Sequence, residues 1–517
     1  MLTLEVLNTL KEYSEKMERT VTLVLQQGEH AKRDELVQFL TDFVSVSDKL
    51  QFEQRETNGA LRSPITFTLE TDGKMTGIHF SGLPGGHEFN SLVLAVLQAS
   101  GSSIRLDDSL QQIIRNIDEP LNFEVFISLS CHNCPDVVQS LNQFALLNPK
   151  ITTETIDGGL FPELIEKRSI QGVPSVHLNG ERFADGKVEV AKLVERLMAR
   201  NPESAYQVTV PQLPQQDVTI VGGGPAGVAA AIYSARKGMK VTMVADRIGG
   251  QVNDTQGIEN LISVVETTGP ELVNALQNHM NQYEITIREH LRVERIEQGD
   301  PKTVHLSSGE SFDSKTVIIA TGAKWRELGI PGERENIGNG VAYCPHCDGP
   351  FFKGRDVAVI GGGNSGIEAA LDLAGIVKTV TVYEFMDQFK ADQVLLDQAR
   401  QRDNITLLNT VATQEILAED GKVTALQYQD RDSEEVHTQE LSAVFVQIGL
   451  IPNSNFVDGL VERTSYGEIV INERGETSAD GIFACGDVTT VPYKQIVVAM
   501  GEGAKASLAA FDYILKQ

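Results

Sequence analysis

The feature that most constrains the fold of this 517-residue chain is a strand, a glycine turn and an alanine-rich helix that occur twice. Residues 218–232 read VTIVGGGPAGVAAAI, and residues 357–371 read VAVIGGGNSGIEAAL. Glycines in such a turn let the backbone approach a pyrophosphate closely, and the following helix offers N–H donors and a favourable dipole. Two loops in this context predict two Rossmann-type nucleotide-binding domains. The expected contact glycines are Gly222, Gly224 and Gly227 in the first loop, and Gly361, Gly363 and Gly366 in the second.

Acidic residues follow the strand after each loop, at the place where an acid reads a ribose hydroxyl. Glu384 ends that strand in the second copy, and no arginine cluster follows it. A carboxylate there would repel the 2′-phosphate of NADPH, so the sequence favours NADH. The alternative is an exposed glutamate at a strand end. In the first copy the equivalent position is Ala245, and Asp246 beside it is the weaker candidate for a ribose contact.

Two Cys-x-x-Cys pairs, Cys131–Cys134 and Cys344–Cys347, account for four of the five cysteines. In a reducing compartment such pairs indicate redox dithiols or metal sites, not structural staples. A structural zinc ion shared by all four thiols is the alternative, but the pairs fall in different expected domains, so we expect no metal. The fifth cysteine, Cys485, lies in an apolar run and is expected to be a small buried hydrophobic residue.

Residues near each pair fit thiol chemistry. Cys131 lies between an expected strand at 123–129 and a helical run from Asp136, which is a thioredoxin-like arrangement. Pro174, before another strand, is expected to be a cis-proline against this dithiol, with an ordinary trans proline as the alternative. Asp348 follows the second pair and could shuttle a proton during reduction, with a simple turn aspartate as the alternative.

A weaker repeat covers the region upstream of the first glycine loop. Residues 78–82 (IHFSG) resemble residues 176–180 (VHLNG), and only the second copy carries cysteines. We expect two thioredoxin-like folds, at 1–100 and 101–199, of which the first has no dithiol. The segment 200–216, rich in proline and polar residues, is expected to be a linker. The expected fold class is α/β, with tandem thioredoxin-like folds followed by two Rossmann-type domains.

Charge and hydropathy exclude several functions. The 44 basic and 71 acidic residues give a formal net charge of −27, which argues against binding to nucleic acid or to an anionic membrane. No stretch approaches the ~18 consecutive apolar residues that a membrane-spanning helix needs, and no signal peptide is visible. The sequence therefore predicts a cytoplasmic protein.

From about residue 217 to the C-terminus, the chain resembles the low-molecular-weight thioredoxin reductases. The resemblance rests on both glycine loops and on the motifs Gly249-Gly250-Gln251, Ala320-Thr321-Gly322-Ala323, Cys344-Pro-His-Cys-Asp-Gly349 and Gly486-Asp487. With the duplicated upstream region, the whole chain is similar to the flavoprotein (F) subunits of bacterial alkyl hydroperoxide reductases. The resemblance implies that the cofactors are FAD and NADH. It also implies a discontinuous FAD-binding domain (217–327 and 452–517) around an inserted NADH-binding domain (328–451).

The same resemblance implies how FAD would be held. The first glycine loop would bind it, with Asp487 beside its ribityl-phosphate region and Gln495 near its isoalloxazine ring. The other contacts would be Gln251, Thr321, Gly322 and Gly486.

The resemblance also implies roles in electron transfer. In the second pair, Cys347 would face the flavin, Cys344 would be the interchange thiol and Asp348 the acid. In the first pair, Cys131 would attack the disulfide of a partner and Cys134 would resolve the mixed disulfide. Glu88 would supply a carboxylate from the cysteine-free half, with a solvated loop glutamate as the alternative.

The family resemblance implies a homodimer and a partner that is a two-cysteine peroxiredoxin, which reduces hydrogen peroxide and organic hydroperoxides. Three other functions stay open from the residues alone. They are a disulfide reductase with another protein acceptor, an oxidase that passes flavin electrons to O₂, and a redox-sensing or zinc-dependent scaffold without enzymatic activity.

Overall fold

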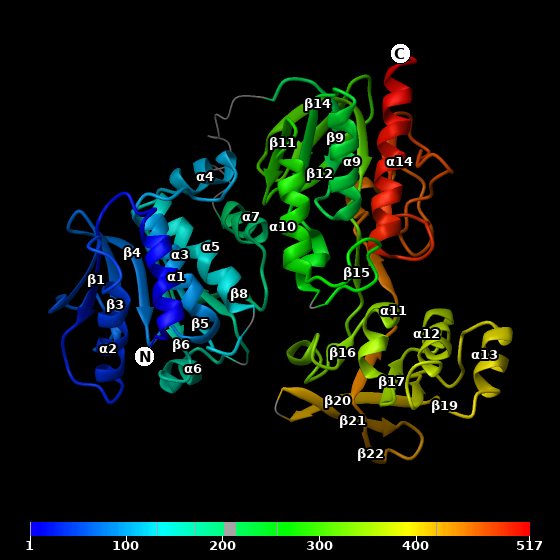
Figure 1. The fold of residues 1–517 in the computed structure, drawn as a ribbon, viewed down its shortest axis with the longest axis horizontal. Helices are drawn as coiled ribbons and strands as arrows, with labels where there is room; N and C mark the ends of the chain where they lie inside the picture. Colours follow the sequence, from blue (N-terminus) through cyan, green and yellow to red (C-terminus); the bar gives the residue numbers. More distant parts are fainter. Residues whose placement is uncertain (1, 132, 171, 201–212, 256, 420) are drawn as a thin grey trace. The chain divides into compact units, whose positions relative to one another are not determined.

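The computed structural model describes the chain except for residues 1, 132, 171, 201–212, 256 and 420, and except for the side chains of Asp254 and Cys347. Most of the expected linker (200–216) therefore lies outside the described residues. Contacts divide the chain into two units (Figure 1). The first unit comprises Met1–Gln212, Arg288–Arg292 and His305–Ser311; the second comprises Leu213–Ile287, Val293–Val304 and Phe312–Gln517.

The first unit is built on one eight-stranded sheet in the order β2-β1-β3-β4-β6-β5-β7-β8. Each half supplies four strands with the same pairing, one parallel pair followed by two antiparallel pairs. The halves join where β4 and β6 pair in parallel. This topology confirms the duplicated thioredoxin-like fold. The strands are β1 (Val21–Gln26), β2 (Leu50–Arg55), β3 (Thr66–Thr71), β4 (Lys74–Ser81), β5 (Leu121–Ile127), β6 (Ile151–Asp157), β7 (Ser175–Leu178) and β8 (Glu181–Asp185).

Helix α5 carries the dithiol of the first unit and packs on β4, β5, β6 and α3. Its residues Val137, Leu141 and Phe144 lie three or four positions apart and are fully buried, which places one apolar face on the sheet. Pro135 in its first turn lacks an N–H that would otherwise need a partner. The helices of this unit are α1 (Leu4–Ser14), α2 (Arg33–Val44), η1 (Gly86–Glu88), α3 (Phe89–Ala99), α4 (Asp108–Arg115), α5 (Cys134–Leu147), α6 (Pro162–Lys167) and α7 (Val190–Arg200).

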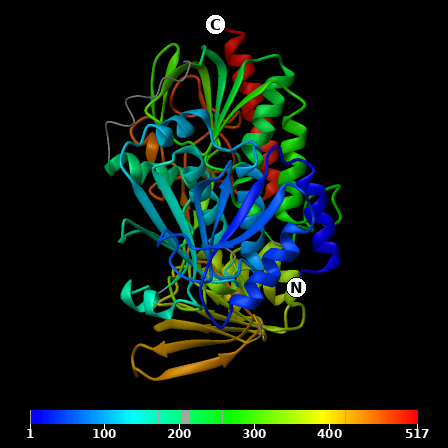
Figure 2. The ribbon, with the colours of Figure 1, turned by 90° about the vertical axis from the view of Figure 1, so that its left-hand side faces the viewer.

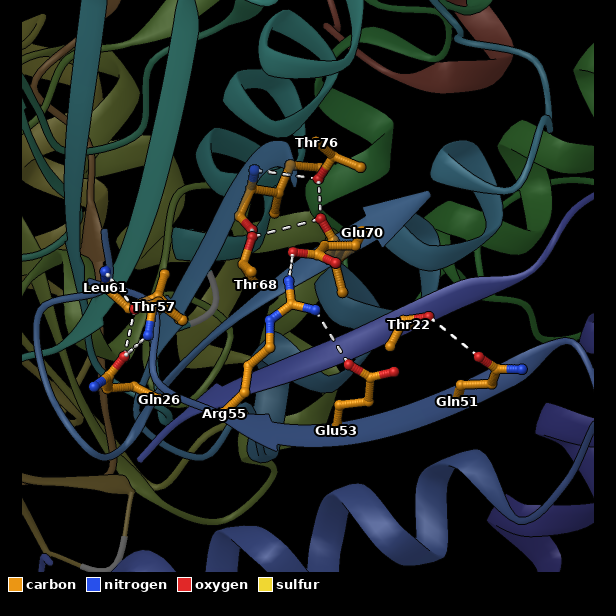
Figure 3. Close-up of polar contacts among 12 residues, drawn as sticks. Thr22, Gln26, Gln51, Glu53, Arg55, Thr57, Leu61, Thr68, Glu70 and Thr76 are labelled. Carbon is orange, nitrogen blue, oxygen red and sulfur yellow. Dashed lines mark hydrogen bonds and ion pairs between the residues drawn. The ribbon is translucent and has the colours of Figure 1, made fainter. Parts of the chain in front are cut away.

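In the cysteine-free half, side-chain hydrogen bonds join the end of β1 to the segment that follows β2 (Figure 3). The Gln26 side chain accepts hydrogen bonds from the backbone N–H of Thr57, at 3.0 Å, and from its hydroxyl, and that hydroxyl accepts one from Leu61 N. Nearby, Arg55 forms ion pairs with Glu53 and with the buried carboxylate of Glu70.

The second unit begins with a sheet in the order β11-β10-β9-β14-β13-β12, to which β25 from near the C-terminus adds by pairing with β14. Helices α9 and α14 cover it and pack closely on each other. Glycine makes this approach possible, because a Cβ at Gly503 would overlap the backbone of Ala226. The elements are β9 (Gln216–Val221), α9 (Pro225–Arg236), β10 (Val241–Ala245), η2 (Gly250–Asp254), α10 (Gly269–Met280), β11 (Ile285–Glu289), β12 (Val293–Glu297), β13 (Lys302–Leu306), β14 (Ser311–Ile319), β25 (Ile482–Ala484), η6 (Gly486–Val488) and α14 (Ile496–Ile514).

A second parallel sheet, in the order β16-β23-β17-β18-β19, carries the second glycine loop. Strands β20, β21 and β22, amber in Figure 2, form a separate antiparallel sheet. In the sequence these three strands lie between β19 and β23. The elements are η3 (Arg334–Asn336), β16 (Val341–Ala342), α11 (Pro345–Asp348), η4 (Gly349–Phe352), β17 (Asp356–Ile360), α12 (Asn364–Ala374), β18 (Thr379–Tyr383), α13 (Gln393–Arg400), β19 (Ile405–Leu408), β20 (Val411–Glu419), β21 (Lys422–Asp430), β22 (Val436–Glu440), β23 (Ala443–Val446) and η5 (Asn455–Val457).

The chain crosses between the two nucleotide-binding sheets twice, and the two crossings pair with each other. They are β15 (Ala323–Trp325) and β24 (Leu450–Pro452), which form an antiparallel two-stranded ribbon. Both sheets are α/β layers of the kind expected from the repeats. Among the described residues, no helix is both long and apolar enough to cross a membrane.

Candidate functional site

The first dithiol lies at the carboxyl end of β5, where Cys131 ends a turn and Cys134 opens α5. The two cysteines are disulfide-bonded, with their Cα atoms 5.6 Å apart. Cys134 is fully buried, whereas Cys131 is only partly buried and its Sγ lies 3.8 Å from the carbonyl oxygen of Val173. The Val173–Pro174 peptide is cis, which confirms the expected cis-proline against the dithiol. Of the two sulfurs, Cys131 is the one that a second thiol can approach.

Glu88 reaches this region from the cysteine-free half. Its helix η1 packs on α5, and His87 N in η1 donates a 3.2 Å hydrogen bond to Leu129 O, two residues before Cys131. Glu88 is fully buried, so the alternative of a solvated loop glutamate is wrong. Burial raises the pKa of Glu88 to about 7; the Ser91 hydroxyl lowers it, and the charge of Asp136 raises it further. A carboxyl titrating near neutral pH therefore stands close to the first turn of α5.

Cys344, in the part that carries the second glycine loop, contacts a residue of the part that carries the first. Cys344 precedes α11 and is disulfide-bonded. The side chain of Cys347 lies outside the described residues, so the pairing of these two cysteines stays a prediction. The Gln495 amide nitrogen lies 3.9 Å from Cys344 Sγ, and Asn260 Nδ2 donates to Gln495 Oε1 at 3.1 Å. The structure thus brings Gln495 to Cys344. Sequence reasoning missed Asn260, because nothing marks a polar residue in a loop as a contact.

Asp348 follows within the same turn of α11. Its backbone N–H donates a 3.0 Å hydrogen bond to Cys344 O. Burial raises the pKa of Asp348 to about 6, and a backbone hydrogen bond with Cys344 acts in the opposite direction. A carboxyl partly protonated near neutral pH can give a proton to a thiolate or take one from a thiol.

The first glycine loop is shaped for close contact with a phosphate. Gly222 has φ 115°, and a Cβ there would overlap the backbone of Ala320. A Cβ at Gly227 would overlap the carbonyl of Gly222, so strand and helix pack without side chains between them. At Gly224, the N-cap of α9, no described atom beyond its chain neighbours lies within 4 Å of a Cβ position. Room in front of the helix N-terminus fits a pyrophosphate.

The second loop repeats this geometry and adds a carboxylate. Gly361 has φ 122°, a Cβ at Gly366 would overlap the Gly361 carbonyl, and Gly363 has open space at the N-cap of α12. Glu384 accepts hydrogen bonds from Gly362 N at 2.6 Å and from Met386 N at 2.8 Å. This carboxylate is therefore fixed against the glycine loop, where a ribose would lie. In the first copy, Asp246 lies half-buried just after β10.

The remaining residues expected at FAD lie on segments that meet near the first loop. Gln251 in η2 donates to the carbonyl oxygen of Ala323, and Thr321 Oγ1 donates to Asn453 O at 2.7 Å. Asn453 N in turn donates to Gly322 O at 2.9 Å, which ties the two crossings between the sheets together.

The motif at residues 486–487 approaches the start of α9. A Cβ at Gly486 would lie 2.9 Å from the Cβ of Ala226, so the turn of η6 stands against the first glycine loop's helix. Burial raises the pKa of Asp487 above its ordinary value, and Lys494 opposes that shift. A half-buried carboxyl in this place is suited to accept hydrogen bonds from hydroxyl groups of a bound ligand.

Cys485 takes no part in these sites. It is fully buried in the apolar cluster beneath α9 and α14, and burial raises the pKa of its thiol to about 12. This confirms the expected small buried hydrophobic residue. Within the described part of the chain, no group of three or more His, Cys, Asp or Glu side chains could hold a metal ion.

The chain is similar to known proteins in both of its units. A family model described as pyridine nucleotide-disulphide oxidoreductase matches residues 216–503, and one described as thioredoxin domain matches residues 121–199. Thioredoxin reductase from Streptococcus pyogenes matches 59% of this chain and 99% of its own, with 36% sequence identity and a TM-score of 0.56.

Relatives that match over nearly the full length include the following two. The alkyl hydroperoxide reductase F subunit of Pseudomonas aeruginosa is 47% identical, covering 100% of this chain and 99% of that protein. A protein of Ferdinandcohnia aciditolerans named NADH dehydrogenase is 46% identical, covering 99% of this chain and 97% of that protein. The chain therefore belongs to the pyridine nucleotide-disulphide oxidoreductases and, over its whole length, to the family of alkyl hydroperoxide reductase F subunits.

Proposed function

We propose that this protein uses NADH to reduce a peroxiredoxin through FAD and two dithiols in series. Electrons would pass from NADH to FAD, then to Cys344–Cys347, then to Cys131–Cys134. The final acceptor would be a two-cysteine peroxiredoxin that reduces hydrogen peroxide and alkyl hydroperoxides. One observation carries the proposal: each unit holds a disulfide-bonded cysteine with a carboxyl nearby whose pKa is raised by burial. The name of the P. aeruginosa relative supports the peroxide end of the path.

The second unit would contain two nucleotide sites, one for FAD and one for NADH. FAD, when bound, supplies the chemistry of accepting a hydride and reducing a disulfide. The N-terminus of α9 and its open Gly224 would hold the FAD pyrophosphate, with Asp487 accepting hydroxyl hydrogen bonds. The N-terminus of α12 would hold the pyrophosphate of NADH, and Glu384 would accept hydrogen bonds from its ribose.

The transfer between the dithiols would be a thiol–disulfide exchange. The Cys344 thiolate would attack Cys131 Sγ, which forms a mixed disulfide and releases the Cys134 thiolate. Cys347 would then attack Cys344 Sγ, which restores the Cys344–Cys347 disulfide and leaves Cys131 reduced. Asp348, with its pKa of about 6, would exchange the proton that thiolate formation requires. Each exchange requires direct contact between two sulfur atoms. The transfer therefore depends on the accessibility of Cys131 Sγ to the attacking thiolate and not on the distance between Cys131 and the flavin.

Two further features belong to the proposal. The part carrying the second glycine loop would rotate about the ribbon of β15 and β24, because NADH and the Cys344 dithiol must use the same flavin in turn. The protein would also form a homodimer, which light scattering of the purified chain would measure directly.

The deciding experiment is NADH-driven peroxide consumption with and without a two-cysteine peroxiredoxin. We expect consumption to need both proteins, and Cys344→Ser to retain flavin reduction by NADH but to leave Cys131–Cys134 oxidised. Cys485→Ala serves as the control, because that thiol is buried away from both dithiols. Should the Cys131–Cys134 pair gain electrons at the normal rate in Cys344→Ser, the path is wrong.

A second candidate function is NADH oxidation with O₂ as the electron acceptor; the name of the F. aciditolerans relative, NADH dehydrogenase, supports NADH as the electron donor. That activity needs neither cysteine pair. Full NADH turnover by Cys131→Ser in the presence of the peroxiredoxin would support it over the dithiol path, whereas loss of turnover would exclude it as the main activity.

A further inference from the structure

Glu333 binds the residue that immediately precedes Cys344. The Tyr343 hydroxyl donates a 2.9 Å hydrogen bond to Glu333 Oε1. The same carboxylate accepts hydrogen bonds from Leu328 N at 2.9 Å and from Gly329 N at 2.7 Å. Glu333 is fully buried, so these three donors replace the water that an exposed carboxylate would have. Removing any one of them leaves a buried charge short of a partner.

The backbone donors come from the chain segment that leaves the two-stranded ribbon. Leu328 and Gly329 follow β15, and Trp325 within β15 stacks on the Tyr343 ring, with centroids 6.1 Å apart and an interplanar angle of 22°. Leu328 and Tyr343 also pack on one apolar cluster of the second nucleotide-binding part. Tyr343 therefore contacts the ribbon through its ring and, through Glu333, the segment that follows the ribbon.

The backbone of Tyr343 is held from another direction. Gln447 Nε2 donates a 2.8 Å hydrogen bond to Tyr343 O. Gln447 N donates at 2.8 Å to Ile360 O, the last residue before the second glycine loop. Burial and the charge of Glu333 hold the pKa of Tyr343 well above its usual range, so its hydroxyl stays a donor at every physiological pH. The ribbon, the strand that precedes the second glycine loop and Cys344 are thus all connected to Tyr343.

We infer that Glu333 and Tyr343 are positioning residues that fix Cys344 to the segment that follows β15 and to the sheet of the second glycine loop, so that the interchange thiol moves with that nucleotide-binding part as one body. This role rests on the proposed electron path. Neither residue touches a reacting atom. Loss of their contact would loosen Cys344 and slow the transfer of electrons from the flavin to the disulfide, while hydride transfer from NADH would proceed as before.

The test compares Tyr343→Phe and Glu333→Gln with Tyr428→Phe. Tyr343→Phe removes only the hydroxyl and keeps the ring on Trp325; Glu333→Gln turns an amide nitrogen towards at least one donor. Tyr428 packs on the same apolar cluster and stacks on His437, so its variant controls for losing a tyrosine hydroxyl there. Emission from Trp325, the chain's single tryptophan, reports whether the ring stack survives.

In rapid mixing of the FAD-loaded protein with NADH, we expect an unchanged rate of flavin reduction. Flavin reoxidation by the disulfide should be about tenfold slower in both test variants, because displacing a reacting group by ~1 Å costs up to ~100-fold in rate. A second readout needs no cofactor chemistry: after chemical reduction of the full chain by a phosphine, iodoacetamide should alkylate Cys344 severalfold faster in both variants. Tyr428→Phe should match the parent protein in each measurement.

The double variant separates positioning from simple loss of stability. If Glu333 and Tyr343 act through one contact, Tyr343→Phe combined with Glu333→Gln should be about as slow as the slower single variant, not slower by the product of both effects. Unchanged reoxidation and alkylation in the single variants, with or without a lower Tm, would overturn the inference. A parent protein that never transfers electrons from flavin to Cys344 would instead overturn the proposed function.

Discussion

Glu88 opposes the folding of its own unit at neutral pH, and replacing it should stabilise that unit. Its pKa lies at about 7 instead of 4.5, chiefly because the carboxyl is buried. One pKa unit corresponds to about 1.4 kcal/mol, so ionising this group in the folded state costs about 3 kcal/mol. Between about pH 4.5 and about pH 7 the folded unit keeps a proton that the unfolded chain has released. Stability therefore falls as pH rises through this window and is level above it.

Glu88→Gln keeps the shape of the side chain and removes the titration. We expect the variant to exceed the parent protein in stability at pH 8, and the difference to be about 2 kcal/mol larger at pH 8 than at pH 5. Pulse proteolysis in urea measures this, because it follows the fragment of residues 1–200 separately from the second unit. Trp325 cannot report it, since the single tryptophan lies in the second unit.

Glu163→Gln is the matched control, because it makes the same chemical change at an exposed position on α6 of the same unit. Its stability should follow that of the parent protein at both pH values. A Glu88→Gln variant that also parallels the parent protein from pH 5 to pH 8 would show that Glu88 ionises in the folded unit as it does in water, and the reasoning from burial would fail.

The other predictions concern the second unit. Glu384→Ala removes a carboxylate that accepts from Gly362 N and Met386 N, and should weaken NADH binding roughly 10-fold or more while affecting NADPH less; equal losses by calorimetry would refute its ribose contact. In the parent protein, the rate at which flavin reduces the disulfide should fall as pH rises through about 6, because Asp348 loses its proton; Asp348→Asn should be slow and flat from pH 5 to pH 8 in rapid mixing. Cys485→Ala should cost about 1 kcal/mol in urea unfolding and leave electron transfer unchanged, and a marked loss of transfer would give that thiol a role.

Local patterns allowed the parts of the fold that depend on short spacing to be predicted. Both glycine loops follow strands and open helices, because the motif specifies turn and helix within a few residues. The position of Cys131 before α5 and the cis-proline at Pro174 could be anticipated in the same way. The parallel pairing of β4 with β6, which joins the two halves, has no local signal, because β-branched strands fit many partners.

Features made by distant segments could not be predicted from sequence. Burial of Glu88 depends on η1 meeting α5, and a Gly-Gly-His-Glu stretch reads equally well as an exposed turn. The contact of Gln495 with Cys344 joins residues 151 positions apart, and Asn260 enters it from a third segment. Glu333 was no candidate at all, because a carboxylate in a glycine-rich turn is usually solvated.

In the proposed electron path, both dithiols would need a nearby group that exchanges protons, and different parts of the chain would supply it. A thiol gives up its proton to become a nucleophile, and a leaving thiolate must regain one, so a group that titrates near neutral pH is needed at each site. At the second dithiol that group would be Asp348, in the same turn of helix as Cys344. At the first, α5 offers only the exposed Asp136, and the buried carboxyl comes from Glu88 in the cysteine-free half. The duplication would then be more than a relic: the half without a dithiol supplies the low-dielectric setting that lifts the pKa of an acid towards 7, and it does so at the expense of about 3 kcal/mol of stability.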